Sequence, residues 1–260
     1  MQNVTEHHSI LDRIVQMTHQ IHLRGHKVHP YLLLLDLGVC VVFVFAFFYT
    51  RLFTGISFLQ FLLLFVITFA GYEFFFLRMK RRLFRIRSRS YLQDVITWIL
   101  PVYVMSAWAI GASVPVALDL LGLLLPLWLS FVRIGCFLGG CCYGLPSRVG
   151  VLYPDQIFVP YESNCGKFQP GANPNCRVFP IQLVESAVNF CIFWVLFMAL
   201  YKLDGVTGYG LPLCFISYCV YRFIGDFFRY SSARPRYGIF SEAQLVSLAL
   251  LGVLVGWLLL

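Results

Sequence analysis

An arginine followed by glycines and cysteines stands at the end of a long, mostly apolar stretch. Residues 120–132 form that stretch, and the segment 133–144 then reads RIGCFLGGCCYG. Glycines at this density interrupt a helix and let backbone amides approach a ligand closely. An arginine at the end of an apolar segment is costly unless it faces water, a partner or an anion. The spacing predicts a phosphate site. The alternative is a helix end from which the arginine snorkels to the membrane interface. The cation is Arg133, and the glycines that would line the site are Gly135, Gly139, Gly140 and Gly144.

Three cysteines, Cys136, Cys141 and Cys142, lie in the same segment. Neighbouring thiols can bind a metal ion, but all six histidines fall within the first 29 residues, so the body of the chain offers none to complete a zinc site. We therefore expect no metal ion and no other cofactor. A Cys136 or Cys141 thiolate stabilised by the adjacent arginine is a candidate covalent nucleophile.

A second group of charges lies near the end of a later apolar segment. Arg222, Asp226 and Arg229 are spaced i, i+4 and i+7, so they share one face of a helix. A charged side chain at the centre of a bilayer costs about 2.5–3.5 kcal/mol, so these three should point inward or towards water. Asp226 can pair with either arginine. The alternative is a structural ladder of ion pairs near the interface.

A single acidic residue lies inside the apolar segment that follows Pro180, a residue suited to the start of a helix. Glu185 is the only acid between Glu162 and Asp204. Gln182 precedes it by three positions, so the two side chains can share a helix face. An acid inside an apolar helix needs a partner, and this makes Glu185 a candidate site residue.

The composition predicts a polytopic membrane protein. Of 260 residues, 59% are hydrophobic and 12% are charged, whereas a soluble domain carries about 25% charged residues. Apolar runs of about 20 residues can cross a bilayer as helices. We therefore expect an all-α membrane protein with about seven transmembrane helices, and lipid rather than nucleic acid as its partner. The predicted spans are 31–49, 54–76, 92–112, 116–133, 181–201, 208–228 and 239–259.

Two segments stand outside the seven spans. Residues 1–30 are polar and predict an amphipathic interfacial helix rather than a cleavable signal peptide. The seven-span domain of the chain is then 31–260, within which the Pro-, Gly- and Asn-rich loop 145–180 is long enough to form a small cap over the site. The apolar residues of the expected interfacial helix are Ile10, Leu11, Ile14, Val15 and Met17.

The charge distribution leaves the orientation in the membrane open. With seven spans, only Arg51 and Lys202 of the 20 basic residues fall on one face. The positive-inside rule makes the opposite, crowded face cytoplasmic. A disulfide between Cys165 and Cys176 in the 145–180 loop would make the same face extracytoplasmic. The basic run at 78–89 would in either case gather anionic lipid.

These segments resemble the prolipoprotein diacylglyceryl transferase family. Its signature, Arg-(Ile/Leu)-Gly-Asn-Phe-x-Asn-Gly-Glu-x-x-Gly, is similar to 133–144. Its Tyr-Gly-x-x-Arg-x-x-x-Glu-Phe-x-Arg pattern is similar to 218–229, and its His-Pro-x-Gln-Leu-Tyr-Glu pattern to 179–185. Asp119 and the final span also fit, so the resemblance covers roughly residues 115–260.

The resemblance implies a seven-span enzyme of the bacterial inner membrane. Such enzymes move a diacylglyceryl group from phosphatidylglycerol to the lipobox cysteine of a prolipoprotein and release glycerol phosphate. By this resemblance, Arg133 and Arg222 would hold the phosphate and stabilise its developing charge. Asp226 and Arg229 would orient Arg222, and Gln182 with the glycines would line the headgroup pocket. The expected partners are an anionic phospholipid and a prolipoprotein.

The chain departs from the family pattern at positions that matter for the chemistry. Cys136 and Cys141 replace the signature Asn and Glu, and no His-Gly-Gly stretch supplies the family's proposed base. The proton of an acceptor thiol would then pass to Glu185, to Asp94, to a cysteine thiolate or to an N-terminal histidine. Two alternatives follow: a related transferase with another acceptor, or a non-enzymatic protein that binds or transports anionic lipid. A transporter is favoured by internal repeats, and the sequence shows none.

Overall fold

The structure is a computed structural model, and it describes residues 9–19, 22–23, 26–27, 29–53, 55–76, 78–79, 82, 99–153, 177–202, 208–230 and 236–259. Asp94, Cys165, Cys176, most of the basic run and the centre of the expected cap loop lie outside these ranges. The disulfide, the cap and the role of Asp94 therefore stay predictions.

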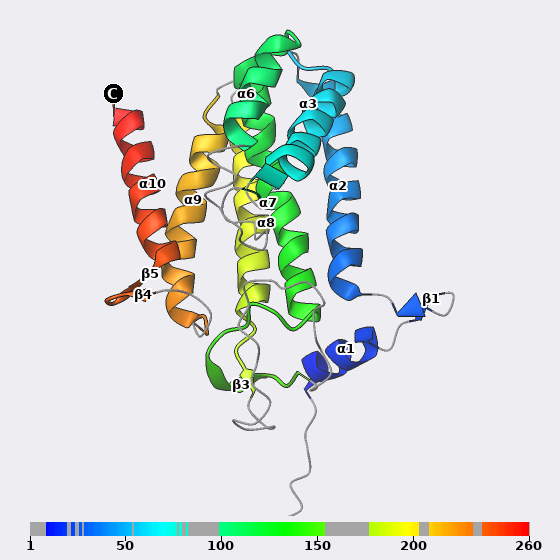
Figure 1. Cartoon of the computed structure of the whole chain (residues 1–260), viewed down its shortest axis with the longest axis vertical. Helices are drawn as coiled ribbons and strands as arrows, with labels where there is room; N and C mark the ends of the chain where they lie inside the picture. Colours follow the sequence, from blue (N-terminus) through cyan, green and yellow to red (C-terminus); the bar gives the residue numbers. More distant parts are fainter. Residues whose placement is uncertain are drawn as a thin grey trace, which may run out of the picture. The chain divides into compact units, whose positions relative to one another are not determined.

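The described part of the chain is helical, with eight α-helices (Figure 1). Short antiparallel strand pairs join β1 (His22–Leu23) to β2 (His26–Lys27) and β4 (Arg236–Tyr237) to β5 (Phe240–Ser241), while β3 spans Pro146–Val151. A π-helical turn, Gly71–Phe76, follows α3, and a 3₁₀ turn, Asp226–Phe228, follows α9. The helices are α1 (Ile10–His19), α2 (Pro30–Leu52), α3 (Phe58–Ala70), α6 (Leu100–Ala109), α7 (Val114–Leu138), α8 (Ile181–Lys202), α9 (Gly210–Gly225) and α10 (Glu242–Leu259).

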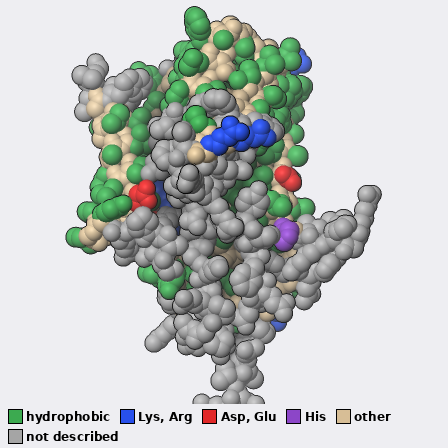
Figure 2. Space-filling model, viewed as in Figure 1, with side chains coloured by type: hydrophobic (Ala, Val, Ile, Leu, Met, Phe, Trp, Pro, Cys, Tyr) green, Lys and Arg blue, Asp and Glu red, His purple; other side chains and the backbone are tan. Residues whose placement is uncertain are grey.

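Four helical segments are long and apolar enough to cross a membrane: Pro30–Leu52, Val114–Leu138, Ile181–Lys202 and Gly210–Phe228. Three shorter apolar helices, α3, α6 and α10, lie within the other three predicted spans. The all-helical class is thus confirmed, and four of the predicted spans coincide with helices that could cross a membrane. The full count of seven stays a prediction. Exposed apolar side chains cover much of the visible surface of the described helices (Figure 2), as lipid contact requires.

Two helices begin with the same local signal. Ser57 before α3 accepts from the backbone N–H of Gln60, whose side chain accepts from the backbone N–H of Ser57. Ser241 and Gln244 make the same reciprocal pair at the start of α10, at 2.9 and 3.2 Å. This capping box satisfies two amides that have no partner within the helix, and it explains why the two helices begin at these residues.

The chain divides into two compact units. The first comprises Met1–Val39, Leu127–Cys191 and Ile216–Leu260, and the second comprises Cys40–Pro126 and Ile192–Phe215. Every predicted site residue of the signature, of the Glu185 segment and of the Arg222 segment belongs to the first unit.

In the first unit α1 is held by a buried carboxylate. Asp12 accepts from the backbone N–H of Leu152 at 2.9 Å and from that of Ser9 at 2.7 Å, and Arg177 donates to both of its oxygens. Burial would raise the pKa of Asp12, but these hydrogen bonds outweigh it and hold the pKa below its ordinary value. Val15 packs with Phe137 and Val151 in the core.

The opposite face of α1 is apolar and exposed. Ile10 and Met17 are largely exposed, and Ile14, on the same face, is exposed by 41%. This pattern fits the predicted interfacial helix, whose contact with a membrane stays a prediction.

In the second unit, close helix contacts and aromatic packing set the fold. Phe43 packs edge-on against Phe61 and Phe65. A Cβ built on Gly122 of α7 would lie 2.3 Å from the carbonyl carbon of Gly210, so only glycine fits at this crossing. Asp119 lies in the second turn of α7 and accepts from the N–H groups of Gly208 and Gly210 at 2.9 and 2.7 Å. It therefore caps α9 from within α7.

Candidate functional site

The signature segment begins as helix and ends in a glycine cap. The sequence predicted that the span ends at Arg133, but α7 continues to Leu138 and includes Gly135. A Cβ on Gly135 would lie 3.2 Å from the carbonyl oxygen of Tyr31, so this glycine permits close packing of α7 on α2. A single glycine costs a helix only about 1 kcal/mol, so it does not interrupt α7.

The helix ends at Leu138 and is closed by Gly140. Its φ is 68°, and its N–H donates to the carbonyl of Phe137 at 3.2 Å. The N–H of Cys141 donates to the carbonyl of Cys136 at 3.0 Å. These two bonds form a Schellman cap, in which a left-handed glycine closes the helix. The cap brings Cys136 and Cys141 together, although five positions separate them.

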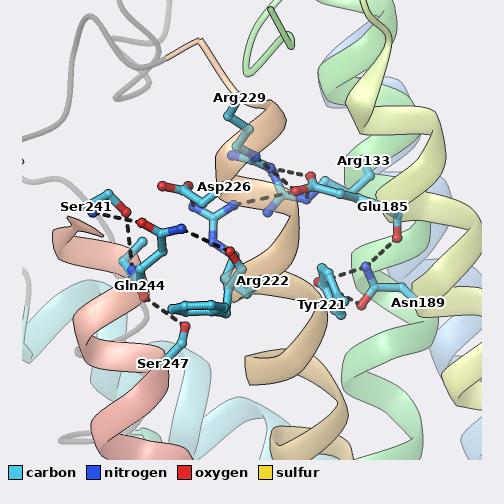
Figure 3. Close-up of polar contacts among 12 residues, drawn as sticks. Arg133, Glu185, Asn189, Tyr221, Arg222, Asp226, Arg229, Ser241, Gln244 and Ser247 are labelled. Carbon is cyan, nitrogen blue, oxygen red and sulfur yellow. Dashed lines mark hydrogen bonds and ion pairs between the residues drawn. The ribbon is translucent and has the colours of Figure 1, made fainter. Parts of the chain in front are cut away.

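Glu185, in the second turn of α8, is the centre of the site (Figure 3). Arg229 donates to both carboxylate oxygens, with Nε 2.9 Å from Oε1 and Nη2 on Oε2. Nε of Arg133 lies 3.2 Å from Oε2, and Nη1 of Arg222 lies 3.5 Å from Oε1. Three arginines from α7, α9 and the segment after α9 thus converge on one acid.

The cluster carries a net positive charge. Asp226 pairs with Arg222 at 3.5 Å, so among the residues that the structure describes three guanidinium groups face two carboxylates, an excess of one positive charge. Glu185, Arg222 and Arg229 are almost fully buried, while the side chain of Arg133 is exposed by 13%. A buried cluster with an excess cation favours an anion at its solvent-accessible edge. Arg133 is the most exposed of the three arginines, so it marks that edge.

The sequence predicted most members of this cluster but not all of its contacts. Arg222 and Asp226 pair as expected. Arg229 was expected to orient Arg222. Both arginines contact Glu185, and the orienting role stays a prediction. The meeting of Arg133 with Glu185 was not predicted, because it depends on how α7 packs on α8.

A layer of polar residues behind Glu185 was missed. The side-chain amide of Asn189 donates to the carbonyl of Glu185 at 2.6 Å and to the hydroxyl of Tyr221 at 3.0 Å. Ser186 donates to the carbonyl of Ser130 at 2.8 Å and ties α8 to α7. Asn189 follows Glu185 by four positions, so the helical repeat gave a signal that a polar face extends along α8.

Gln182 and Gly144 connect the residues around the cluster to the loop segment that follows α7. Gln182 is fully buried, and its Nε2 donates to the carbonyl of Cys141 at 2.7 Å. Gly144 forms an antiparallel bridge with Arg229, and a Cβ there would lie 2.7 Å from the carbonyl oxygen of Phe179. The glycine thus lets two backbone segments close around Arg229. Whether Gly135, Gly139, Gly140, Gly144 and Gln182 line a headgroup pocket stays a prediction.

The three cysteines of the signature lie together at the end of α7. Their Sγ atoms are all within 4.8 Å of one another. Cys136 and Cys141 are buried, with exposures of 5% and 4%, and Cys142 is partly exposed. The sequence named Cys136 and Cys141 as candidate nucleophiles. The structure adds Cys142 as the most exposed thiol of the group.

The fold and the cluster define a helical membrane protein with buried arginines arranged around one acid. Residues 94–260 match the family described as prolipoprotein diacylglyceryl transferase, so the chain belongs to that family. This confirms the family resemblance of the signature, of the Glu185 segment and of the Arg222 segment.

The individual relatives share only about 30% sequence identity with the chain, over about half of its length. The chain is 31% identical to the phosphatidylglycerol–prolipoprotein diacylglyceryl transferase of Clostridium tetani over 46% of this chain and 43% of that protein. It is 29% identical to transferase 2 of Clostridium perfringens over 50% of this chain and 45% of that protein. It is 31% identical to the enzyme of Xanthomonas campestris pv. campestris, over 52% and 49%. The chain therefore spans about half the length of the curated relatives that it matches.

Proposed function

We propose that the protein transfers a diacylglyceryl group from phosphatidylglycerol to the lipobox cysteine of a prolipoprotein. Family membership and the arginine cluster around Glu185 support this proposal. The observation that carries it is the excess positive charge, among the described residues, of two buried arginines and the partly buried Arg133 over two acids. An anionic phosphate diester is the donor that such a site would hold at a membrane.

In this reaction the acceptor thiol loses its proton and its sulfur bonds to the glyceryl carbon. The bond between that carbon and the phosphate oxygen breaks, and glycerol phosphate leaves with both bonding electrons. Negative charge therefore grows on the phosphate. Arg133, at the exposed edge, and Arg222 would stabilise this charge, as preorganised cations do at a leaving group.

Glu185 fits a positioning role better than that of the general base. Its carboxylate faces three guanidinium groups, and protonation would remove the charge that holds all three. Asp226 would likewise position Arg222, and Arg229 would position Glu185. The acceptor's proton would then pass to another group, for which Asp94, a cysteine thiolate and an N-terminal histidine are the proposals.

The test is mass spectrometry of products from the purified full-length protein, phosphatidylglycerol and a lipobox peptide. We expect the peptide to gain a diacylglyceryl group as glycerol phosphate is released. Arg133→Gln and Arg222→Gln should lower the rate by roughly 10²–10³. The control is Arg51→Gln, which removes an exposed arginine at the end of α2.

Each other outcome has its own meaning. Lipid consumed with the peptide unmodified would indicate a related transferase with another acceptor. Phosphatidylglycerol bound by folded protein without turnover would indicate a non-enzymatic lipid-binding protein, and would refute the proposed reaction. Unchanged turnover in both arginine variants would refute the phosphate-holding role.

The covalent role of the cysteines has a separate test. A nucleophilic Cys136 or Cys141 would form a thioether with the glyceryl carbon before transfer, detectable as a mass increase on the protein. Full activity of both Cys136→Ser and Cys141→Ser would exclude this intermediate.

A further inference from the structure

The cysteine cluster has a geometry that follows from the way α7 ends. In the Schellman cap the third-last residue of the helix meets the second residue after the capping position, which is the third residue beyond the helix. These positions hold Cys136 and Cys141, whose backbones share the hydrogen bond of 3.0 Å. Cys142 then takes a φ of 59°, and it is the only described residue besides glycines with positive φ. A cysteine rarely adopts this conformation, and such strain is concentrated at functional sites.

The spacing of the three sulfur atoms suits a metal ion. A thiolate binds zinc at about 2.3 Å, so sulfur atoms around one ion lie about 3.8 Å apart in a tetrahedral site and about 4.0 Å apart in a trigonal one. The Sγ atoms of Cys136, Cys141 and Cys142 lie within 4.8 Å of one another. Rotations of the side chains that shorten these distances by about 1 Å would close the site.

We propose that Cys136, Cys141 and Cys142 bind one soft d¹⁰ metal ion, Zn²⁺ or Cu⁺, at the end of α7. Soft thiolates select these ions over the hard cations Mg²⁺ and Ca²⁺. Three thiolates alone complete a trigonal Cu⁺ site, and Zn²⁺ takes an oxygen as its fourth ligand. The missing histidine, which argued against zinc in the sequence, is then not required.

A protein oxygen is available beside the cluster. Gln182 is fully buried, and its Oε1 accepts no hydrogen bond from any residue that the structure describes. Its Nε2 donates to the carbonyl of Cys141, which places the amide group against the backbone of one of the three cysteines. A buried acceptor without a donor is costly, and coordination of a cation would satisfy it.

The charges nearby suit a metal thiolate. Three thiolates with Zn²⁺ carry one negative charge, and with Cu⁺ they carry two. Arg133 lies close enough to attract a thiolate at Cys136 or Cys142, and Arg229 lies close enough to attract one at Cys142. The metal would therefore fix the end of the helix that carries Arg133. This binding does not depend on the proposed transferase reaction.

The test measures metal bound to the full-length protein, freed of any affinity tag and purified in a reducing buffer. One sample is dialysed against Zn²⁺, and another receives Cu⁺ without oxygen and with a competing chelator. We expect a metal content of one cysteine-bound ion per chain, measured by inductively coupled plasma mass spectrometry. Cys136→Ser, Cys141→Ser and Cys142→Ser should each lose that ion. Cys219→Ser, which alters a buried cysteine of α9 outside the cluster, should retain it.

The difference between wild type and each variant removes the contribution of the N-terminal histidines and of the remaining cysteines. A second measurement is thermal unfolding, in which the bound ion should raise the Tm of the wild type and of Cys219→Ser but not of the cluster variants. If the three cluster variants lose only Zn²⁺, or only Cu⁺, relative to wild type, that ion is the one that the site binds. Equal metal content in wild type and in the three cluster variants would overturn the proposal.

Discussion

Replacing Glu185 with glutamine removes one negative charge and leaves the shape of the side chain nearly unchanged. In the wild type three guanidinium groups face Glu185 and Asp226, and in the variant they face Asp226 alone. The net charge of this buried cluster rises from one to two. Removing one partner of a buried ion pair typically costs about 3–5 kcal/mol. Because Glu185 is 2% exposed, solvent screens little of that cost.

The assay is reversible denaturant unfolding in detergent, supported by thermal unfolding. For a chain of this size a loss of 3–5 kcal/mol corresponds to a Tm lower by about 6–20 °C. The matched control is Asp36→Asn, which neutralises an exposed carboxylate of α2 and should change stability by less than about 0.5 kcal/mol.

A double-mutant cycle separates the ion-pair network from general disruption. Arg229→Gln removes the arginine that grips both oxygens of Glu185. The double variant Glu185→Gln with Arg229→Gln should cost clearly less than the sum of the two single changes, because fewer uncompensated charges remain buried. If the costs add within about 0.5 kcal/mol, or if Glu185→Gln behaves like Asp36→Asn, the cluster does not hold the helices as we argue.

Two further changes test the packing and the pH dependence. Because its hydrogen bonds hold the pKa of Asp12 below its ordinary value, the carboxylate stabilises the docked α1 above pH ~4 and loses this effect as the pH falls through the lowered pKa. Hydrogen exchange of α1 should therefore be faster in Asp12→Asn than in wild type at pH 7, and equal rates would contradict the clamp. Gly122→Ala places a methyl group against Gly210 and should cost at least about 1–3 kcal/mol of unfolding free energy. Gly252→Ala, where a Cβ meets nothing within 4 Å, should be neutral, and a similar cost for both would argue against the close crossing.

Helical periodicity predicted the part of the site that lies on a single helix. Arg222 and Asp226 share a face because of their spacing, and they form an ion pair. The requirement for a partner likewise marked Glu185 as a candidate site residue, and the structure shows it buried. Its three partners could not be predicted, since they come from elements whose packing depends on contacts far apart in the sequence.

The end of α7 shows why glycine alone is an uncertain signal. Gly135 was expected to interrupt the helix, yet it lies inside α7 because α2 packs closely against it. Gly140 ends the helix because the chain turns left-handed there. Recognising Gly139-Gly140 as a helix cap would have placed Cys136 beside Cys141 from the sequence. The conformation of Cys142 gives no such sequence signal, because cysteine has no preference for positive φ.

The clamp on α1 also sets an order of events during synthesis. Asp12 is bound by Leu152 and Arg177, which follow it by 140 and 165 residues. At about 5–20 residues per second, the ribosome adds Arg177 roughly 8–33 s after Asp12. During this interval the nascent α1 cannot dock, while its apolar residues Ile10, Ile14 and Met17 remain available to the lipid surface. The last contact of the N-terminal helix is thus made only after the spans between it and α8 have left the ribosome.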